Sequence, residues 1–160
     1  MATRAQLHDL FVAHYARLLR LAALLIDDLA ACEDVVAEAF ARLHTAQLRE
    51  PDKALAYLQQ SVVNLSRSSL RHRSVVQRHS LAARHLMVAE DPVLAAVDRD
   101  ALKHALRGLQ SRQREAIILR YYLDLDVRAA AELMGCSPGA VKAYTSRGIA
   151  ALSDQLEALR

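Results

Sequence analysis

Apolar residues recur through most of the chain at spacings of three and four, which is the period of an α-helix. The first such stretch runs from Arg4 to about Ile26, and Asp27-Asp28 ends it. A second runs from about Leu29 to Ala46, with acidic residues on its outer face. The predicted core positions of these two helices are Leu7, Leu10, Phe11, Leu18, Leu21, Ala22, Leu25, Cys32, Val35 or Val36, Ala39, Phe40 and Leu43.

A third helix is predicted from about Lys53 to Arg73, after a loop at 47–53 in which Pro51 ends any helix and Asp52 can cap the next. Its packing face carries Leu55, Leu58, Val62, Leu65 and Ser69. The opposite face has an aromatic ring, two amides and two guanidinium groups, which suit stacking, hydrogen bonding and phosphate contacts with a single nucleic-acid strand. An ordinary solvated helix face explains this ridge equally well. The ridge consists of Tyr57, Gln60, Asn64, Arg67 and Arg71.

The helical pattern weakens from Ser74 to about Pro92, which indicates a linker between two domains. The sequence therefore predicts an all-α protein with two small helical domains, 1–75 and 93–160, joined by residues 76–92. In the second domain, helices are expected from about Val93 to Leu106 and from Ser111 to Leu123. The core candidates of the latter helix are Ile117, Ile118, Tyr121 and Tyr122.

The stretch from Asp126 to Leu152 has the pattern of a helix-turn-helix. Asp126 can cap the first helix, Gly135 can end it, and Ser137 with Pro138 can start the second. On a helical wheel, Val141, Thr145, Gly148, Ile149, Leu152 and Leu156 form a packing side. The other side carries Gly139, Lys142, Ala143, Ser146 and Arg147, and its Lys and Arg can reach guanine edges and phosphates in a major groove.

Composition narrows the possible functions. An apolar content of 53% with 4 Gly and 3 Pro favours an all-helical chain. The net charge of +3 is small, but five Arg and no acidic residue lie between Ala54 and Ala89. Cys32 and Cys136 have no CxxC spacing, and the histidines at 72, 79 and 85 are not spaced as metal ligands. No catalytic arrangement, cofactor motif or membrane-length apolar stretch is present, so a non-enzymatic, cytoplasmic protein without cofactor or metal is expected.

Several motifs, in order, resemble a bacterial RNA polymerase sigma factor of the small extracytoplasmic-function (ECF) group. Residues 32–40, CEDVVAEAF, look like the family's core-binding helix, and Tyr57-Leu58 through Asn64 look like its W-L-x-x-x-x-x-N segment. The second domain is similar to the family's promoter-binding module in Arg114-Glu115-Ala116, Leu119-Arg120-Tyr121-Tyr122, Leu133-Met134-Gly135, Gly139-Ala140-Val141-Lys142 and Arg147.

The resemblance implies a region 2-like domain, a region 4-like helix-turn-helix domain, and specific partners. Core polymerase would be a partner through its clamp helices and flap, and the clamp helices would bind Asp34, Glu38, Phe40 and Leu43. The minus-thirty-five element would be read by Lys142, Ala143, Ser146 and Arg147. A flipped base of the minus-ten element would be captured by the loop and ridge residues Gln47, Leu48, Arg49, Lys53, Tyr57, Gln60, Asn64, Arg67 and Arg71. An anti-sigma factor would keep the protein silent.

Four positions depart from the family pattern. Ala37 replaces the usual Gln, Tyr57 replaces Trp, Ala129 replaces a common Glu, and Tyr144 stands where many members have a basic residue. These changes leave the promoter sequence and some polymerase contacts open. The competing interpretations are a stand-alone helix-turn-helix regulator, which would normally need a dimerisation helix, and an adaptor that does not bind DNA.

Overall fold

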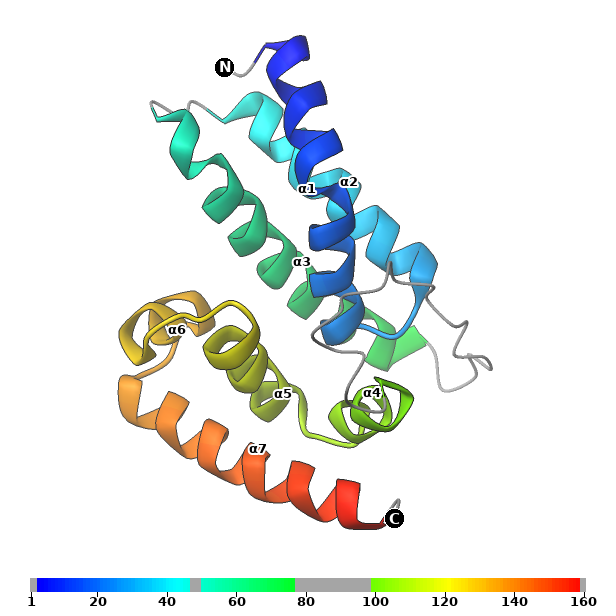
Figure 1. The fold of residues 1–160 in the computed structure, drawn as a ribbon, viewed down its shortest axis with the longest axis vertical. Coiled ribbons are helices and arrows are strands. Elements are labelled where there is room, and N and C mark those ends of the chain that lie inside the picture. Colours follow the sequence, from blue (N-terminus) through cyan, green and yellow to red (C-terminus); the bar gives the residue numbers. More distant parts are fainter. Residues whose placement is uncertain (1–2, 47–49, 77–98, 159–160) are drawn as a thin grey trace. The chain divides into compact units, whose positions relative to one another are not determined.

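The computed structural model describes residues 3–46, 50–76 and 99–158, and every regular element in these ranges is a helix (Figure 1). The chain divides into two compact units, Met1–Ala89 and Glu90–Arg160, called here the N-terminal and C-terminal units. The predicted all-α class with two small helical domains is confirmed. The predicted linker lies outside the described residues except for Val76, and so does the predicted helical segment from Val93 to residue 98.

The N-terminal unit is built from α1 (Arg4–Leu25), α2 (Leu29–Thr45) and α3 (Ala54–Val76), with a short 3-10 turn, η1 (Pro51–Lys53), before α3. Each of the three helices packs against the other two. The break between α1 and α2 is fixed by Asp28, whose side chain accepts a hydrogen bond from the backbone N–H of Ala30 (3.1 Å).

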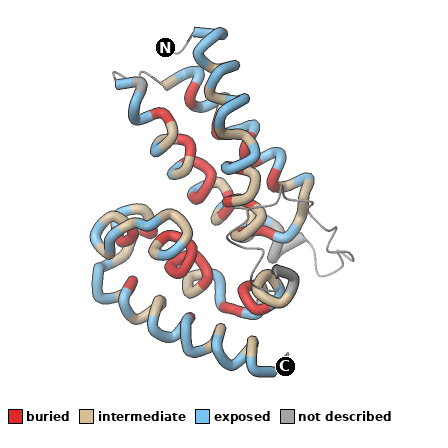
Figure 2. The backbone as a smooth tube through the Cα atoms, in the orientation of Figure 1, coloured by how far each residue is buried: buried red, intermediate tan, exposed pale blue. Residues whose placement is uncertain are grey.

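The core of this unit lies where the three helices face one another (Figure 2). Most predicted core positions are buried, and both Val35 and Val36 are inside. Phe11 is an exception, because 44% of it is exposed. Its ring stacks on Tyr15 at 4.5 Å and tilts against half-buried Phe40 at 5.3 Å. Helical period alone placed Phe11 inside, but the fully buried residues of α1 begin only at Leu18.

The C-terminal unit contains α4 (Arg99–Arg107), α5 (Ser111–Ile117), α6 (Val127–Met134) and α7 (Pro138–Ala158). A π-helical turn, η3 (Ile118–Tyr122), continues α5. α7 is the long element of this unit, and α4, α5 and α6 all contact it (Figure 1). The core of the C-terminal unit contains Ala105, Leu106, Leu109, Ala116, Ile117, Ile118, Leu119, Ala130, Ala131, Met134 and Val141.

The π-helical turn explains one wrong sequence prediction. In η3 the N–H of Leu123 donates to the carbonyl of Ile118 (3.0 Å), five residues back, so the turn is wider than an α-helical one. Ile117 and Ile118 are buried as predicted. Tyr121, however, is 63% exposed, because positions beyond Ile118 no longer follow the 3.6-residue period.

In residues 3–46, 50–76 and 99–158, no helix is long and apolar enough to span a membrane. No group of three or more His, Cys, Asp or Glu side chains in those same ranges is placed to hold a metal ion.

Candidate nucleic-acid interface

The helix-turn-helix forms with the predicted caps. Asp126 accepts a hydrogen bond from the N–H of Ala129 (2.7 Å) and so starts α6. Gly135 ends α6 in the left-handed region, at φ 66° and ψ 37°, where a residue with Cβ is strained. Ser137 accepts from the N–H of Ala140 (3.1 Å) at the start of α7. These local interactions fix the path of the chain from one helix to the next.

The second helix of the motif, α7, carries on one side the residues predicted to read DNA. This side, with Lys142, Ala143, Ser146 and Arg147, is called here the reading side. Lys142, Ser146 and Arg147 are exposed, and Ala143 is half-buried. On the packing side, Val141 and Gly148 are buried. Ile149 was predicted on the packing side but is 43% exposed, because it lies three residues after Ser146, next to the reading side.

Arg112, which was not predicted as a functional residue from the sequence, connects α5, α6 and α7. Arg112 of α5 donates a hydrogen bond to the carbonyl of Met134, the last residue of α6, at 2.7 Å. It forms an ion pair with Glu115 at 3.4 Å, and its guanidinium lies 5.8 Å from the ring centre of Tyr144 on α7. Arg112 therefore links the end of α6 to the reading helix. Its i, i+3 spacing from Glu115 was the one sequence signal for this role.

A second arginine holds the start of the unit together. Arg114 is buried, and its guanidinium donates to the carbonyls of Leu106 (2.8 Å) and Arg107 (2.9 Å) at the end of α4. Both carbonyls belong to the last turn of α4, so the arginine supplies hydrogen-bond donors at the C-terminus of this helix. Arg114 and Glu115 thus have structural contacts in this unit.

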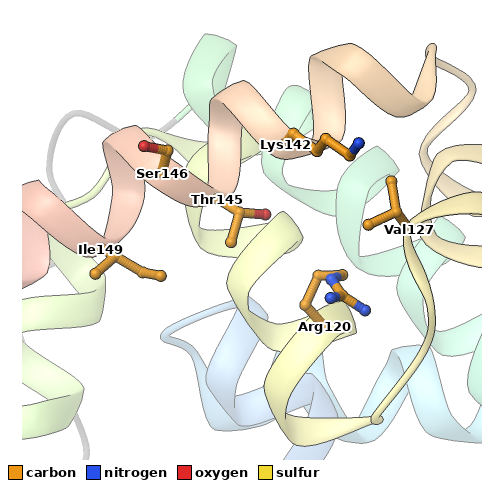
Figure 3. Close-up of a pocket in the computed structure, with 6 residues that line it drawn as sticks. All are labelled: Arg120, Val127, Lys142, Thr145, Ser146 and Ile149. Carbon is orange, nitrogen blue, oxygen red and sulfur yellow. The ribbon is translucent and has the colours of Figure 1, made fainter.

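An open hollow borders the reading side (Figure 3). Lys142 and Ser146 belong to it and to the reading side alike. Arg120 enters from η3, and its guanidinium also donates to the carbonyl of Leu125. The complete lining is Arg120, Val127, Lys142, Thr145, Ser146 and Ile149.

The ridge predicted on the third helix is present along α3. Its five residues are spaced at i, i+3, i+7, i+10 and i+14, which keeps them on one side of the helix. Gln60, Asn64 and Arg71 are exposed, while Tyr57 and Arg67 are half-buried. Three of the predicted strand-capturing residues, Gln47, Leu48 and Arg49, lie outside the described residues. Lys53 is present in η1, where it pairs with Glu50 at 3.1 Å on the surface.

The four residues predicted to dock on polymerase do not share one surface. Asp34 and Glu38 are exposed one turn apart on α2, and Glu38 pairs with Arg42 at 3.1 Å. Phe40 faces α1 through its contact with Phe11. Leu43 is only 1% exposed, so it packs inside the N-terminal unit and offers no surface to a partner. Asp34 and Glu38 remain as one candidate docking surface, called here the acidic face of α2.

Comparison with known proteins gives a match for the C-terminal unit. Residues 99–152 match the family model described as sigma-70, region 4. The match includes the helix-turn-helix, the arginines that support it and the hollow.

Related proteins extend the likeness to most of the chain. The chain is 32% identical over 139 residues to the probable RNA polymerase sigma factor RfaY of Xanthomonas campestris pv. campestris, covering 81% of this chain and 35% of that protein. It thus spans about a third of the length of this relative. The extracytoplasmic function sigma factor SigJ of Mycobacterium tuberculosis has a TM-score of 0.67 and 27% identity, covering 91% of this chain and 53% of that one.

The chain belongs to the RNA polymerase sigma factors of the extracytoplasmic-function type. Proteins of this family are not enzymes; they direct transcription initiation. A further similar fold is that of the sigma factor RpoE of Bartonella quintana, solved in complex with the anti-sigma factor NepR. It has a TM-score of 0.68 and 24% identity and covers 96% of this sigma factor and 98% of that chain, which supports the fold.

Proposed function

We propose that this sigma factor binds core RNA polymerase and directs it to specific promoters, where it helps to open the DNA. The observation that carries the proposal is the capped helix-turn-helix with an exposed Lys142, Ser146 and Arg147, inside the segment matched to sigma-70 region 4. Such a helix can enter a major groove and present its side chains to base edges. Reading of the minus-thirty-five element is therefore assigned to α7, with Ala143 close to the bases.

The test of this function is assembly and promoter selection. Tagged protein expressed in its own cells should copurify with core polymerase, and the reconstituted complex should start transcription at a defined set of promoters. A stand-alone regulator would instead bind DNA without polymerase, and an adaptor would bind neither. Either of those results would reject the sigma-factor function for this chain.

Polymerase docking is assigned to the acidic face of α2. Asp34 and Glu38 are exposed, so they can meet a basic partner surface without rearrangement of the core. The Glu38–Arg42 pair is about half exposed and contributes little to folding, of the order of 0.5 kcal/mol. A double change of Asp34→Lys and Glu38→Lys should therefore weaken core binding while the helical content stays the same.

A matched control exists at the end of α7. Asp154 and Glu157 are also exposed and lie three residues apart, so replacing both by Lys gives the same change in charge away from α2. Core binding is measured by equilibrium titration and folding by circular dichroism. Full affinity in the α2 variant, or equal loss in both variants, would remove the acidic face from the proposal.

Minus-ten capture is assigned to the ridge on α3, with Asn64 as the residue that contacts the base. In the described residues, the side-chain amide of Asn64 makes no hydrogen bond within the protein, while its backbone carbonyl accepts one from Ser68 (3.2 Å). An exposed amide can donate to and accept from the edge of a base that has left the duplex. Tyr57 at the head of the ridge supplies a ring for stacking, and Arg67 and Arg71 supply positive charge.

An anti-sigma factor is proposed as the partner that controls this protein. Both the reading side of α7 and the ridge on α3 present exposed side chains in the folded units, so an external protein is needed to cover them. The fold likeness to a sigma factor solved with an anti-sigma factor is consistent with such a partner. Purification from unstressed cells should recover an inhibitor in near-equal amount, and a free, transcriptionally active protein under all conditions would contradict the proposal.

A further inference from the structure

One side chain, that of Arg112 on α5, contacts both helices of the helix-turn-helix. Its Nη2 donates to the carbonyl of Met134, the last residue of α6, at 2.7 Å. Its guanidinium carbon lies 5.8 Å from the ring centre of Tyr144, in the second turn of α7. The turn between α6 and α7, residues 135–137, is therefore spanned by a side chain from a third helix.

Arg112 is itself fixed to α5. Its Nη1 forms an ion pair with Glu115 at 3.4 Å, and the side chain of Glu115 is only 6% exposed. Two different nitrogens of the planar guanidinium thus have acceptors, one in α5 and one in α6, which sets the plane of the group. α5 also packs closely on α7, where a Cβ at Gly148 would lie 2.7 Å from Cδ1 of Ile117. Arg112 therefore ties α6 to the pair of helices that α5 and α7 form.

The angle between α6 and α7 decides where the reading side meets the bases. In a helix-turn-helix the first helix lies across the DNA backbone, and the second enters the groove. Arg147 is nine residues after Pro138, the first residue of α7, which is about 14 Å along a helix, so a tilt of about 10° at the turn displaces it by about 2 Å. Contacts to base edges tolerate a displacement of only about 0.5 Å. A small change of this angle is therefore enough to change which base is preferred.

The contacts of Arg112 favour positioning over a direct contact with DNA. Its guanidinium meets Met134, Glu115 and Tyr144 inside the C-terminal unit, and its side chain is only 33% exposed. We propose that Arg112 is a positioning residue for promoter recognition, which fixes the angle between α6 and α7, and thereby the base preference of the reading side, without touching DNA. This inference rests on the proposed function, because it requires α7 to read promoter bases.

The first test measures base discrimination in the full chain assembled with core polymerase. Promoters with each single substitution in the minus-thirty-five element compete for wild type and for Arg112→Met, which keeps an unbranched side chain but loses every donor. A bidentate base contact discriminates by about fivefold to 150-fold, and Arg112→Met should lower this ratio by at least about threefold. The slope of log K against log salt concentration should stay the same, because no phosphate contact is lost. A slope that falls by about 0.9 would show that Arg112 binds a phosphate directly, and would overturn the proposal.

A matched variant separates positioning from stability. Leu106→Ala, in the core of α4, should lower the thermal midpoint without changing a contact at the turn between α6 and α7. At a temperature where circular dichroism shows both variants fully folded, Leu106→Ala should keep the wild-type base preference. Equal loss of discrimination in Leu106→Ala and Arg112→Met would mean that Arg112 only stabilises the fold.

Variants of Tyr144 test the link to α7. Tyr144→Phe keeps the ring and should keep the base preference, whereas Tyr144→Leu should change it in the same direction as Arg112→Met. The double variant of Tyr144→Leu and Arg112→Met should lose less than the product of the two single losses, because both changes remove the same contact. Losses that multiply would show that the two residues act separately, and would reject the proposed link.

A measurement without DNA keeps this inference apart from the proposed function. Spin labels are attached through Glu132→Cys on α6 and Ser153→Cys on α7, both at exposed positions, in a full chain that also carries Cys136→Ser. Cys32 stays in place because it is buried. The distance between the two labels then reports the angle between the helices.

Arg112→Met should shift or broaden this label distance by about 2 Å, the displacement expected from a tilt of about 10°. Leu106→Ala should leave it unchanged. An unchanged distance in Arg112→Met would overturn the positioning role and leave the proposed function intact. If the wild-type complex selects no promoter, the proposed function fails, and the label distance still decides whether Arg112 fixes the angle.

Discussion

At the scale of single residues, Tyr144 shows how a departure from the family pattern is accommodated. Many family members have a basic side chain here, whereas this sigma factor places an aromatic ring 5.8 Å from the guanidinium of Arg112. A cation near the face of an aromatic ring is stabilised by about 0.5–1 kcal/mol at exposed sites. Because Arg112 also binds the carbonyl of Met134, the ring helps to hold α7 on the end of α6.

Replacement of Tyr144 should reveal this contact. Tyr144→Arg removes the ring and brings two cations together, so the free energy of unfolding should fall by about 1 kcal/mol in low salt. Tyr144→Phe keeps the ring and should change it by less than about 0.5 kcal/mol. Urea unfolding of the full chain measures both. Equal stability of the two variants would mean that the ring and Arg112 are neighbours without a useful interaction.

Arg147 is the residue for which we expect base-specific readout. Arg147→Ala should weaken promoter binding by about 1–3 kcal/mol and relax the preference at one base pair of the upstream element. Competition between promoter variants in the reconstituted complex gives both numbers. Lys103→Ala serves as the control for loss of one positive charge. An unchanged base preference in Arg147→Ala would show that this side chain does not read the sequence.

Residue-level predictions from sequence succeeded where the interaction was local. The caps Asp126, Gly135 and Ser137 depend on neighbours within three or four residues, and the structure confirms all three. Arg112 and Arg120 were missed as supports, because their acceptors are carbonyl groups, whose positions depend on how the chain folds back on itself. A sequence shows which side chains can donate, but it does not show which carbonyls lie within reach.

At the scale of elements, the packing of α7 on α5 depends on one glycine. A Cβ at Gly148 would lie 2.7 Å from Cδ1 of Ile117 and 3.3 Å from the backbone oxygen of Gln113. Both distances are below ordinary van der Waals contact, and the second involves backbone that cannot easily give way. The glycine therefore lets the two helices approach closely at the cost of a residue with weak helix propensity.

Gly148→Ala should destabilise the C-terminal unit. Its gain in helix propensity is about 1 kcal/mol at most, whereas overpacking typically costs about 1–3 kcal/mol, so the net change should be a loss. Gly139→Ala is the matched control, because a Cβ there meets only Oγ of Ser137 at 3.9 Å. Thermal unfolding should show a lower midpoint for Gly148→Ala and an equal or higher one for Gly139→Ala. The reverse order would contradict the close-packing role.

The helices themselves were largely predictable. The predicted first helix, from Arg4 to about Ile26, ends within one residue of the observed α1, and the two reading-motif helices have the predicted starts. Helical periodicity wrongly predicted that Phe11, Tyr121 and Ile149 are buried, for two reasons. Phe11 and Ile149 lie on helix sections or edges that no other described element fully covers, and Tyr121 lies where the helical period changes. Periodicity reports which residues share a face, but coverage of that face is decided by the rest of the fold.

At the scale of the whole molecule, the division of labour between the two units can be tested with Asn64. Closed duplex hides the base edges, so Asn64→Ala should leave formation of the closed complex nearly intact. Formation of the heparin-resistant open complex should fall, and the preference at one downstream promoter base should shift. A template with a pre-melted bubble should restore part of the activity, because unpairing no longer depends on base capture.

A purely structural role of Asn64 makes a different prediction. The variant would then either behave as wild type or lose helicity in a thermal melt. Gln60→Ala, one turn earlier on the same exposed side of α3, controls for loss of an amide from the ridge. If Asn64→Ala folds normally and opens all promoter base variants as wild type does, strand capture by this ridge is wrong.

The overall organisation was predictable because two independent sequence signals supported it, namely helical periodicity and the ordered motifs of the family. The candidate sites were predictable only in part. Sequence motifs placed Asp34, Glu38, Phe40 and Leu43 together, but on a helix Phe40 and Leu43 point roughly opposite to the acidic pair, and the N-terminal unit buries Leu43. A sequence motif contains residues that bind a partner together with residues that pack inside the protein, and the sequence alone does not separate the two kinds.

The π-helical turn η3 affects the direction in which the residues that follow it point relative to α5. An α-helix advances about 100° per residue, so the extra residue in this wide turn rotates everything that follows by roughly that amount relative to α5. Arg120 lies within this turn, where it donates to the carbonyl of Leu125 and lines the hollow. A chain shortened by one residue within 118–122 could keep its helical content and every reading side chain. Those side chains would nevertheless face a different direction, so the length of this turn, as well as the identity of the residues in α7, determines where the protein meets DNA.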